Sequence, residues 1–180
     1  MNKPLSTLIA TLLLTLAWAV AHAAEPAPAW SDTDTTGKDI EFPADLDRPT
    51  LLLFWATWCP YCKALMPHLQ SIIDEHGAEK VQVIAVSVFE DEGSEPGAYV
   101  DKQGFQFRVI ENGDLFAEDY GVKTTPALFL VSAEGNTLWS LADARQAEQR
   151  VEGIKNHGLR AARRAPFWAA ELRKALAEVD

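Results

Sequence analysis

The sequence predicts an α/β fold: a central mixed β-sheet flanked by helices, with a C-terminal helical extension. Residues 51–56 and 81–88 are continuous apolar runs, typical of central strands buried on both faces, and a helical pattern at 60–76 separates them. Two such strands joined by a helix form a parallel βαβ unit with a right-handed crossover. Residues 127–131 and 137–141 are two further strand patterns joined by turn residues, which predicts a hairpin.

The remaining elements are short or helical. The first helix is expected to end near Gly77 and to be kinked by Pro67. The tail is expected to be helical from residue 146, in two pieces broken near Gly158 and Pro166. Between the second apolar run and the hairpin, the pattern predicts an acidic loop at 89–97, a helix at 98–103, a strand at 106–110 and a helix at 114–120.

The two cysteines of the chain, Cys59 and Cys62, lie at the start of the predicted helix 60–76. Their spacing brings both sulfurs within the short reach of a disulfide. The first cysteine then lies at the helix N-terminus, where backbone N–H groups and the helix dipole stabilise a thiolate. We therefore predict that Cys59 attacks a partner disulfide and that Cys62 resolves the mixed disulfide. Pro60 fits the first helical turn, where a missing N–H costs nothing.

A Cys-x-x-Cys pair can also belong to a zinc site, a structural disulfide or a copper site. A structural zinc site needs four ligands, and the four histidines are not spaced to complete one. A purely structural disulfide usually closes a longer loop, because a short loop constrains the unfolded chain little. Binding of Cu(I) by the two thiolates is the main alternative that is left open. No cofactor is expected beyond the redox-active Cys59–Cys62 disulfide.

The N-terminus has the pattern of an export signal. Lys3 is followed by an apolar run at 5–20 and by the small-x-small cleavage motif at 21–23. The expected organisation is a signal peptide at 1–23, a flexible lead-in at 24–29, a folded domain at 30–142 and a C-terminal helical extension at 143–180. The run is short for a membrane span, and an uncleaved anchor is left open. Export to a bacterial periplasm suits a thiol–disulfide site.

The charge of the chain disfavours nucleic acid as a partner and leaves an acidic partner or anionic lipid open. The formal net charge is −10, which disfavours nucleic acid as a partner because binding it rewards a basic face. The stretch from Arg145 to Lys174 is nevertheless basic, with eight basic residues against three acidic ones. It is either a solvated helix surface or a docking face for an acidic partner or anionic lipid.

Four segments carry a resemblance to a known family: 54–63 (FWATWCPYCK), Met66-Pro67, 83–88 (VIAVSV) and 120–130 (YGVKTTPALFL). Over residues 30–142 the chain resembles the thioredoxin fold, and more closely the exported TlpA-like branch of thiol–disulfide oxidoreductases. The resemblance implies that Pro126 is a cis-proline facing the disulfide and that the backbone of Thr125 pairs with the substrate chain. It also implies that Trp58 forms an exposed apolar rim for partner contact.

The activity that the resemblance implies is reduction of protein disulfides. The expected partners are protein disulfide or dithiol substrates and a membrane thiol electron donor, and the protein is expected to be a monomer. A net disulfide oxidase or isomerase, and a Cu(I)-handling module that uses the same thiols, are the alternatives.

Two positions depart from the family pattern. Leu53 stands where thioredoxins have a buried acid, and Leu65 where members dedicated to cytochrome c maturation have a glutamate. Glu90, after the second apolar run, is an acid that could approach the site, and water is the other route for proton transfer. Between the cysteines, Pro60-Tyr61 resembles the dipeptide of glutaredoxins. Tyr61 supplies no positive charge, so an intermediate reduction potential is expected; its ring either stacks on a substrate or is exposed to solvent.

Overall fold

The computed structural model describes residues 25–144 and 153–179. The strands are β1 (Glu25–Pro26), β2 (Trp30–Thr33), β3 (Asp39–Phe42), β4 (Thr50–Trp55), β5 (Gln82–Ser87), β6 (Arg108–Ile110), β7 (Ala127–Val131) and β8 (Asn136–Ser140). The helices are α1 (Pro60–His76), α2 (Pro96–Gln103), α3 (Asp114–Asp119), α4 (Leu141–Ala144) and α5 (His157–Leu176). The predicted signal peptide at 1–23 lies outside the described residues.

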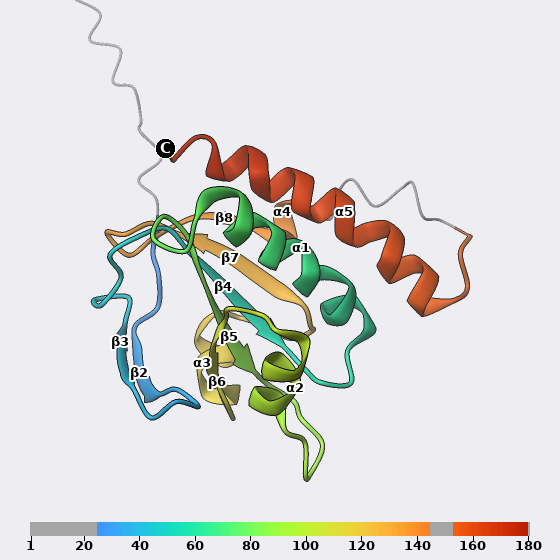
Figure 1. Cartoon of the computed structure of the whole chain (residues 1–180), viewed down its shortest axis with the longest axis horizontal. Helices are drawn as coiled ribbons and strands as arrows, with labels where there is room; N and C mark the ends of the chain where they lie inside the picture. The colour runs from blue at the N-terminus through green and yellow to red at the C-terminus, as the bar shows by residue number, and fades with distance from the viewer. Residues whose placement is uncertain (1–24, 145–152, 180) are drawn as a thin grey trace, which may run out of the picture.

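The central sheet confirms the predicted α/β architecture (Figure 1). Within the described residues, six strands form one sheet in the order β1-β8-β7-β4-β5-β6. Strand β4 pairs in parallel with β5, and α1 connects them, as the βαβ pattern predicts. Strand β7 pairs antiparallel with β4 and with β8, so the sheet is mixed. The predicted strands and first helix agree with the observed bounds to within two residues.

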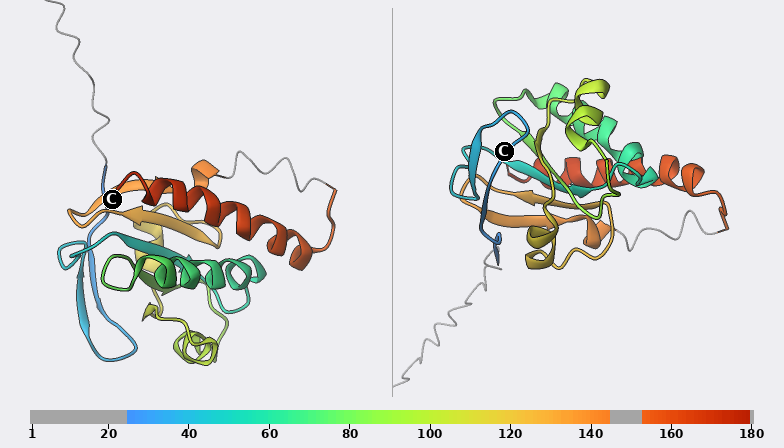
Figure 2. Two further views of the ribbon diagram at one scale, coloured as in Figure 1. Left: turned by 45° about the horizontal axis from the view of Figure 1, so that its top comes forward. Right: turned by 90° about the horizontal axis from the view of Figure 1, so that it is seen from below.

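Helices cover both faces of this sheet (Figure 2). One core cluster packs between the sheet and α1, α2 and α5, and a second packs between the sheet, α3 and the β2–β3 hairpin. All six residues of β4 are buried. Leu51, Leu53 and Trp55 belong to the first cluster, whereas Leu52 and Phe54 belong to the second. The continuous apolar run therefore divides alternately between two cores, as the side-chain alternation of a strand requires.

The hairpin of β2 and β3 was not predicted. It forms a separate antiparallel pair, and its loop reaches the edge strand β6, where the Thr35 N–H donates to the Val109 carbonyl at 3.0 Å. On β3 only Ile40 and Phe42 are buried. The hairpin thus contributes alternate apolar residues of β3 to the second core. Its loop makes a backbone hydrogen bond to the outer side of the edge strand β6.

The predicted flexible lead-in at 24–29 is wrong for residues 25–28. Glu25 and Pro26 pair antiparallel with β8, and the Ala27 N–H donates to the Gly135 carbonyl at 2.9 Å. The Tyr120 hydroxyl donates to the Pro28 carbonyl at 2.9 Å. The prolines of this segment do not prevent pairing, because β1 lies at the edge of the sheet, where one side of the strand makes no ladder bonds.

The predicted break of the tail at Pro166 is also wrong, since α5 runs without interruption through this proline. The helix begins at His157, next to Gly158, with the Asn156 side chain accepting a hydrogen bond from the Leu159 N–H at 3.0 Å. Its buried residues face α1, and Trp168 packs into the first core. This packing offsets the backbone bond that proline removes. The part of the predicted tail at 145–152 lies outside the described residues.

None of the helices in residues 25–144 and 153–179 has the length and apolar character of a membrane span.

An ion pair fastens the β2–β3 hairpin to the edge of the main sheet. Arg108 Nε lies 2.6 Å from Asp34 Oδ2, and the Asp34 residue is only 7% exposed. Burial raises the pKa of Asp34, but hydrogen bonds from the Thr36 side chain, the Lys38 N–H, Arg108 and the Thr36 N–H outweigh it and lower that pKa to about 2. The ionised form of Asp34 is therefore the one that holds the hairpin in place.

Replacing Asp34 with asparagine is expected to lower the free energy of unfolding by about 1–3 kcal/mol at pH 7, because the half-buried Arg108 guanidinium loses its buried charged partner. A carboxyl whose pKa is lowered on folding stabilises the native state above its ordinary pKa of 3.8, and this contribution is lost as pH falls through about 2. Urea unfolding at several pH values should therefore show the difference between D34N and wild type shrinking below pH 4. Asp47→Asn is the control, since Asp47 is 68% exposed beside Arg48 and should change stability little.

Candidate active site

The two cysteines form a disulfide at the N-terminus of α1. Cys59 is the N-cap residue, its Sγ accepts a hydrogen bond from the Cys62 N–H at 3.1 Å, and the two Cα atoms are 5.3 Å apart. Pro60 occupies the first turn, as predicted. Cys59 is 2% exposed, whereas Cys62 is completely buried. The sulfur of Cys59 therefore lies where helix N–H groups stabilise a thiolate, and this cysteine is the one closer to solvent.

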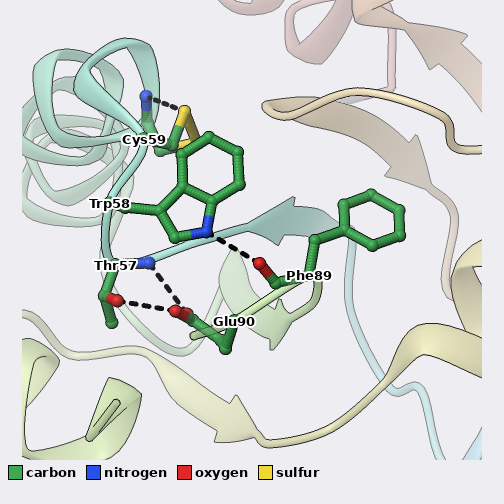
Figure 3. The surroundings of a disulfide bond; sticks show 6 residues. Thr57, Trp58, Cys59, Phe89 and Glu90 are labelled. Carbon is green, nitrogen blue, oxygen red and sulfur yellow. Dashed lines mark hydrogen bonds between the residues drawn. A yellow bond between two sulfur atoms is a disulfide. The ribbon is translucent and has the colours of Figure 1, made fainter. Parts of the chain in front are cut away.

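The segment before Cys59 is held by the segment after β5 (Figure 3). The Glu90 carboxylate accepts from the Thr57 N–H at 2.8 Å and from the Thr57 hydroxyl at 2.6 Å. The Trp58 Nε1–H donates to the Phe89 carbonyl at 2.7 Å. Two consecutive residues on one loop thus bind two consecutive residues on the other. Glu90, which the sequence placed only as an acid able to approach the site, contacts the active-site loop directly.

Two large aromatic side chains are exposed beside the disulfide. Trp58 is 51% exposed, in agreement with the apolar rim that the resemblance implied. Phe89 is 40% exposed and has a φ of +56°, a left-handed conformation that bulky residues rarely adopt. The Phe89 N–H donates to Asp114 Oδ1 at 3.0 Å, which holds this conformation. Phe89 lies in the predicted acidic loop at 89–97, and no role was predicted for it.

The peptide bond between Thr125 and Pro126 is cis, as the resemblance implied. This loop lines a cavity of about 240 Å³ together with Tyr61 of the cysteine motif and three residues of α5 between positions 157 and 168. The lining residues are Tyr61, Thr124, Thr125, Pro126, His157, Arg164 and Trp168. The structure therefore brings the predicted residues Tyr61, Thr125 and Pro126 together at one groove.

Neither of the two expectations for Tyr61 describes its environment fully. Its ring is half-buried and packs on α5: the Arg164 guanidinium lies 5.6 Å from the ring centroid, and Trp168 is a neighbour at 6.3 Å. The ring meets His157 edge-on at 6.2 Å, with Tyr61 Oη 3.4 Å from His157 Nδ1. Residues of the C-terminal helix α5 thus line one side of the groove at the site. This contact joins residues 96 positions apart, so no local pattern could indicate it.

The surroundings of the cysteines inside the protein are apolar. Leu53 and Leu65 are completely buried in the same core cluster as Cys59 and Cys62. Further along α1, burial and the nearby charge of Arg173 lower the pKa of His68. In the described part of the chain, no three His, Cys, Asp or Glu side chains are grouped as metal ligands.

Fold and site together define a thiol–disulfide oxidoreductase with a thioredoxin-like fold: a Cys-x-x-Cys disulfide caps a helix after a central strand, and Tyr61 of this motif lines one groove with the cis-proline loop. The sequence profile of the AhpC/TSA family matches residues 23–139, and the chain belongs to this family. Its similarity to named thiol–disulfide oxidoreductases is consistent with the TlpA-like branch.

Two curated relatives illustrate this similarity. Sporulation thiol-disulfide oxidoreductase A of Bacillus subtilis is 30% identical over 162 residues, which cover 84% of this chain and 97% of that protein. Thiol-disulfide oxidoreductase ResA of Halalkalibacterium halodurans is 31% identical over 134 residues, covering 74% of this chain and 75% of that protein. Both names state the activity class that the Cys59–Cys62 geometry supports.

Solved structures agree on the fold. StoA from Bacillus subtilis has a TM-score of 0.50 with 26% identity, covering 63% of this chain and 87% of that chain. The thioredoxin domain of a thiol-disulfide oxidoreductase from Bacteroides vulgatus has a TM-score of 0.62 with 15% identity, covering 87% of this chain and 97% of that chain. The latter likeness concerns the fold alone.

The left-handed conformation of Phe89 leads to a stability prediction. Phe89→Gly is expected to be more stable than Phe89→Ala by about 1 kcal/mol, because glycine adopts a positive φ without a Cβ clash. Urea unfolding of both variants measures this difference. Asn112→Gly and Asn112→Ala are the comparison, and a similar difference is expected because φ at Asn112 is +60°, in the same left-handed region. Equal stabilities of F89G and F89A would show that this backbone is not strained.

Proposed function

We propose that this protein is an exported reductase of protein disulfides that cycles between a Cys59–Cys62 dithiol and a disulfide. The observation that carries the proposal is the position of Cys59 at the N-cap of α1, two residues before Tyr61, which lines the groove at the cis-proline. A thiolate stabilised there is an effective nucleophile, and an adjacent extended loop offers backbone groups to a substrate chain. The N-terminal export pattern at 1–23 supports a periplasmic location.

The reaction transfers two electrons from the protein to the substrate. The Cys59 thiolate attacks one sulfur of a substrate disulfide, which breaks the substrate S–S bond and releases its other sulfur as a thiolate. The Cys62 thiolate then attacks Cys59 Sγ in the mixed disulfide, which forms the Cys59–Cys62 bond and releases the second substrate thiolate. Water takes and supplies the protons, since Leu53 and Leu65 offer no acid. A membrane thiol donor would then reduce the disulfide.

A substrate chain bound at the same groove would contact Thr125 and Trp58. The backbone of Thr125 would pair with an extended segment beside the target cysteine, and Trp58 would supply apolar contact area. Complete burial of Cys62 supports its role in resolution, because a buried sulfur does not meet a substrate disulfide in solvent but lies within bonding distance of Cys59 Sγ. A monomer suffices for this cycle, since both cysteines, the cis-proline and the groove belong to one chain.

Single cysteine variants separate the two roles. Reduced Cys62→Ser is expected to form a covalent adduct with insulin, because the mixed disulfide can no longer be resolved. Cys59→Ser is expected to form no adduct and to lose insulin reduction entirely. Non-reducing electrophoresis with and without dithiothreitol measures the adduct. Adducts and catalytic activity in C59S would show that the two roles are assigned wrongly.

The direction of electron flow is tested by the reduction potential of the Cys59–Cys62 couple in glutathione buffers. A value below roughly −240 mV is expected for a reductase, since it would lie near the thioredoxin end of the range. A value above roughly −180 mV would place the couple among oxidising proteins and contradict the proposed direction. Stoichiometric Cu(I) binding without insulin reduction would instead favour a copper-handling module.

A further inference from the structure

Glu90 is an acidic residue whose side chain contacts Thr57, two residues before Cys59. It lies three residues beyond the end of β5 and is half-buried. The two positions at which related proteins carry an acid are Leu53 and Leu65 here, and both are completely buried among apolar groups. Any carboxylate effect on the thiols must therefore come from another part of the chain, and the loop after β5 brings one to Thr57.

Both oxygens of the Glu90 carboxylate are used. Oε1 accepts from the Thr57 N–H and Oε2 accepts from the Thr57 hydroxyl, so the side chain acts as a two-point acceptor. This arrangement suits the ionised form, which accepts at both oxygens. Ser94 Oγ lies 3.3 Å from Thr57 Oγ1 on the same side. Thr57 is thus fixed through its backbone and its side chain together.

Thr57 precedes Cys59 by two residues, which limits the distance between their Cα atoms to about 7 Å. A charge bound to Thr57 therefore lies within roughly one Debye length, about 10 Å at 0.1 M salt, of the Cys59 backbone. A negative charge at this range disfavours the Cys59 thiolate and hence the dithiol state. Because the disulfide carries no charge, the same interaction does not affect it.

We infer that Glu90 is a positioning residue that also lowers the reduction potential of the Cys59–Cys62 couple, by holding Thr57–Trp58 and by placing a fixed negative charge beside the Cys59 thiolate. In glutathione buffer the couple converts the disulfide and two glutathione thiols into the dithiol and one glutathione disulfide. Stabilising the thiolate moves this equilibrium toward the dithiol. The inference depends on this couple alone and not on the direction of electron flow in the cell.

Glu90→Gln removes the negative charge of residue 90 but can keep its two hydrogen bonds with Thr57. The glutamine carbonyl can accept from the Thr57 N–H, and its amide can donate to Thr57 Oγ1, whose own proton then turns toward Ser94 Oγ. Glu90→Ala removes both the hydrogen bonds with Thr57 and the charge. Glu92→Gln is the matched control, because it removes one negative charge from an exposed position of the same loop.

The expected result for E90Q is a shift of the glutathione equilibrium of roughly tenfold toward the dithiol, equivalent to about 30 mV for a two-electron couple. The pH profile of iodoacetamide alkylation of reduced Cys59 should move to lower pH in the same variant. E92Q should change either quantity less than twofold. These readouts report charge at the thiol, which a purely structural contact would leave unchanged.

An E90Q equilibrium and alkylation profile equal to those of wild type would overturn the inference, even if E90A were altered. An equal shift in E90Q and E92Q would also overturn it, since net charge rather than the Thr57 contact would then be the cause. Failure of the reductase proposal is distinguishable: loss of insulin reduction in wild type leaves the glutathione equilibrium measurable in every variant.

Discussion

The position of β4 is the constraint on which the active site depends. This strand is hydrogen-bonded to β5 on one side and to β7 on the other, and its residues are buried in both cores. Its C-terminal end cannot move without disturbing both layers. Because only four residues separate the end of β4 from the start of α1, Cys59 is held at the helix N-terminus by the most constrained element of the fold. The thiolate-stabilising geometry thus follows from core packing.

The other parts of the site lie at the same end of the sheet, where β4 ends. Parallel β4 and β5 end side by side, with Trp55 opposite Ser87, so the loops that follow them meet. Antiparallel β7 begins at this edge, which brings the cis-proline loop to the same place. The Thr57–Glu90 contact is therefore a consequence of the parallel pairing. Alpha/beta sheets generally place binding sites at the carboxyl ends of their parallel strands.

Sequence reasoning succeeded where a local pattern determined the structure. The buried strands, the first helix and the cysteine pair each have a signal in consecutive residues, whereas the cis form of Pro126 was implied by the family resemblance. The β2–β3 hairpin was missed because only Ile40 and Phe42 of β3 are buried, which leaves no continuous apolar run. The break at Pro166 was predicted from local propensity, but the packing of α5 on α1 outweighs that propensity. The contacts of Tyr61 and Glu90 join distant segments and required the register of the folded sheet.

Reduction potentials of Cys-x-x-Cys proteins are often interpreted from the two residues between the cysteines. Here that dipeptide is not an isolated unit, because Tyr61 stacks with Arg164 of α5, and the residue two places before Cys59 binds Glu90. A charged group of each sign thus reaches the motif from a distant segment. The free energy of the thiolate depends on both groups as well as on the helix dipole. The expectation of an intermediate potential used Pro60-Tyr61 alone and therefore omitted two charges that tertiary structure supplies.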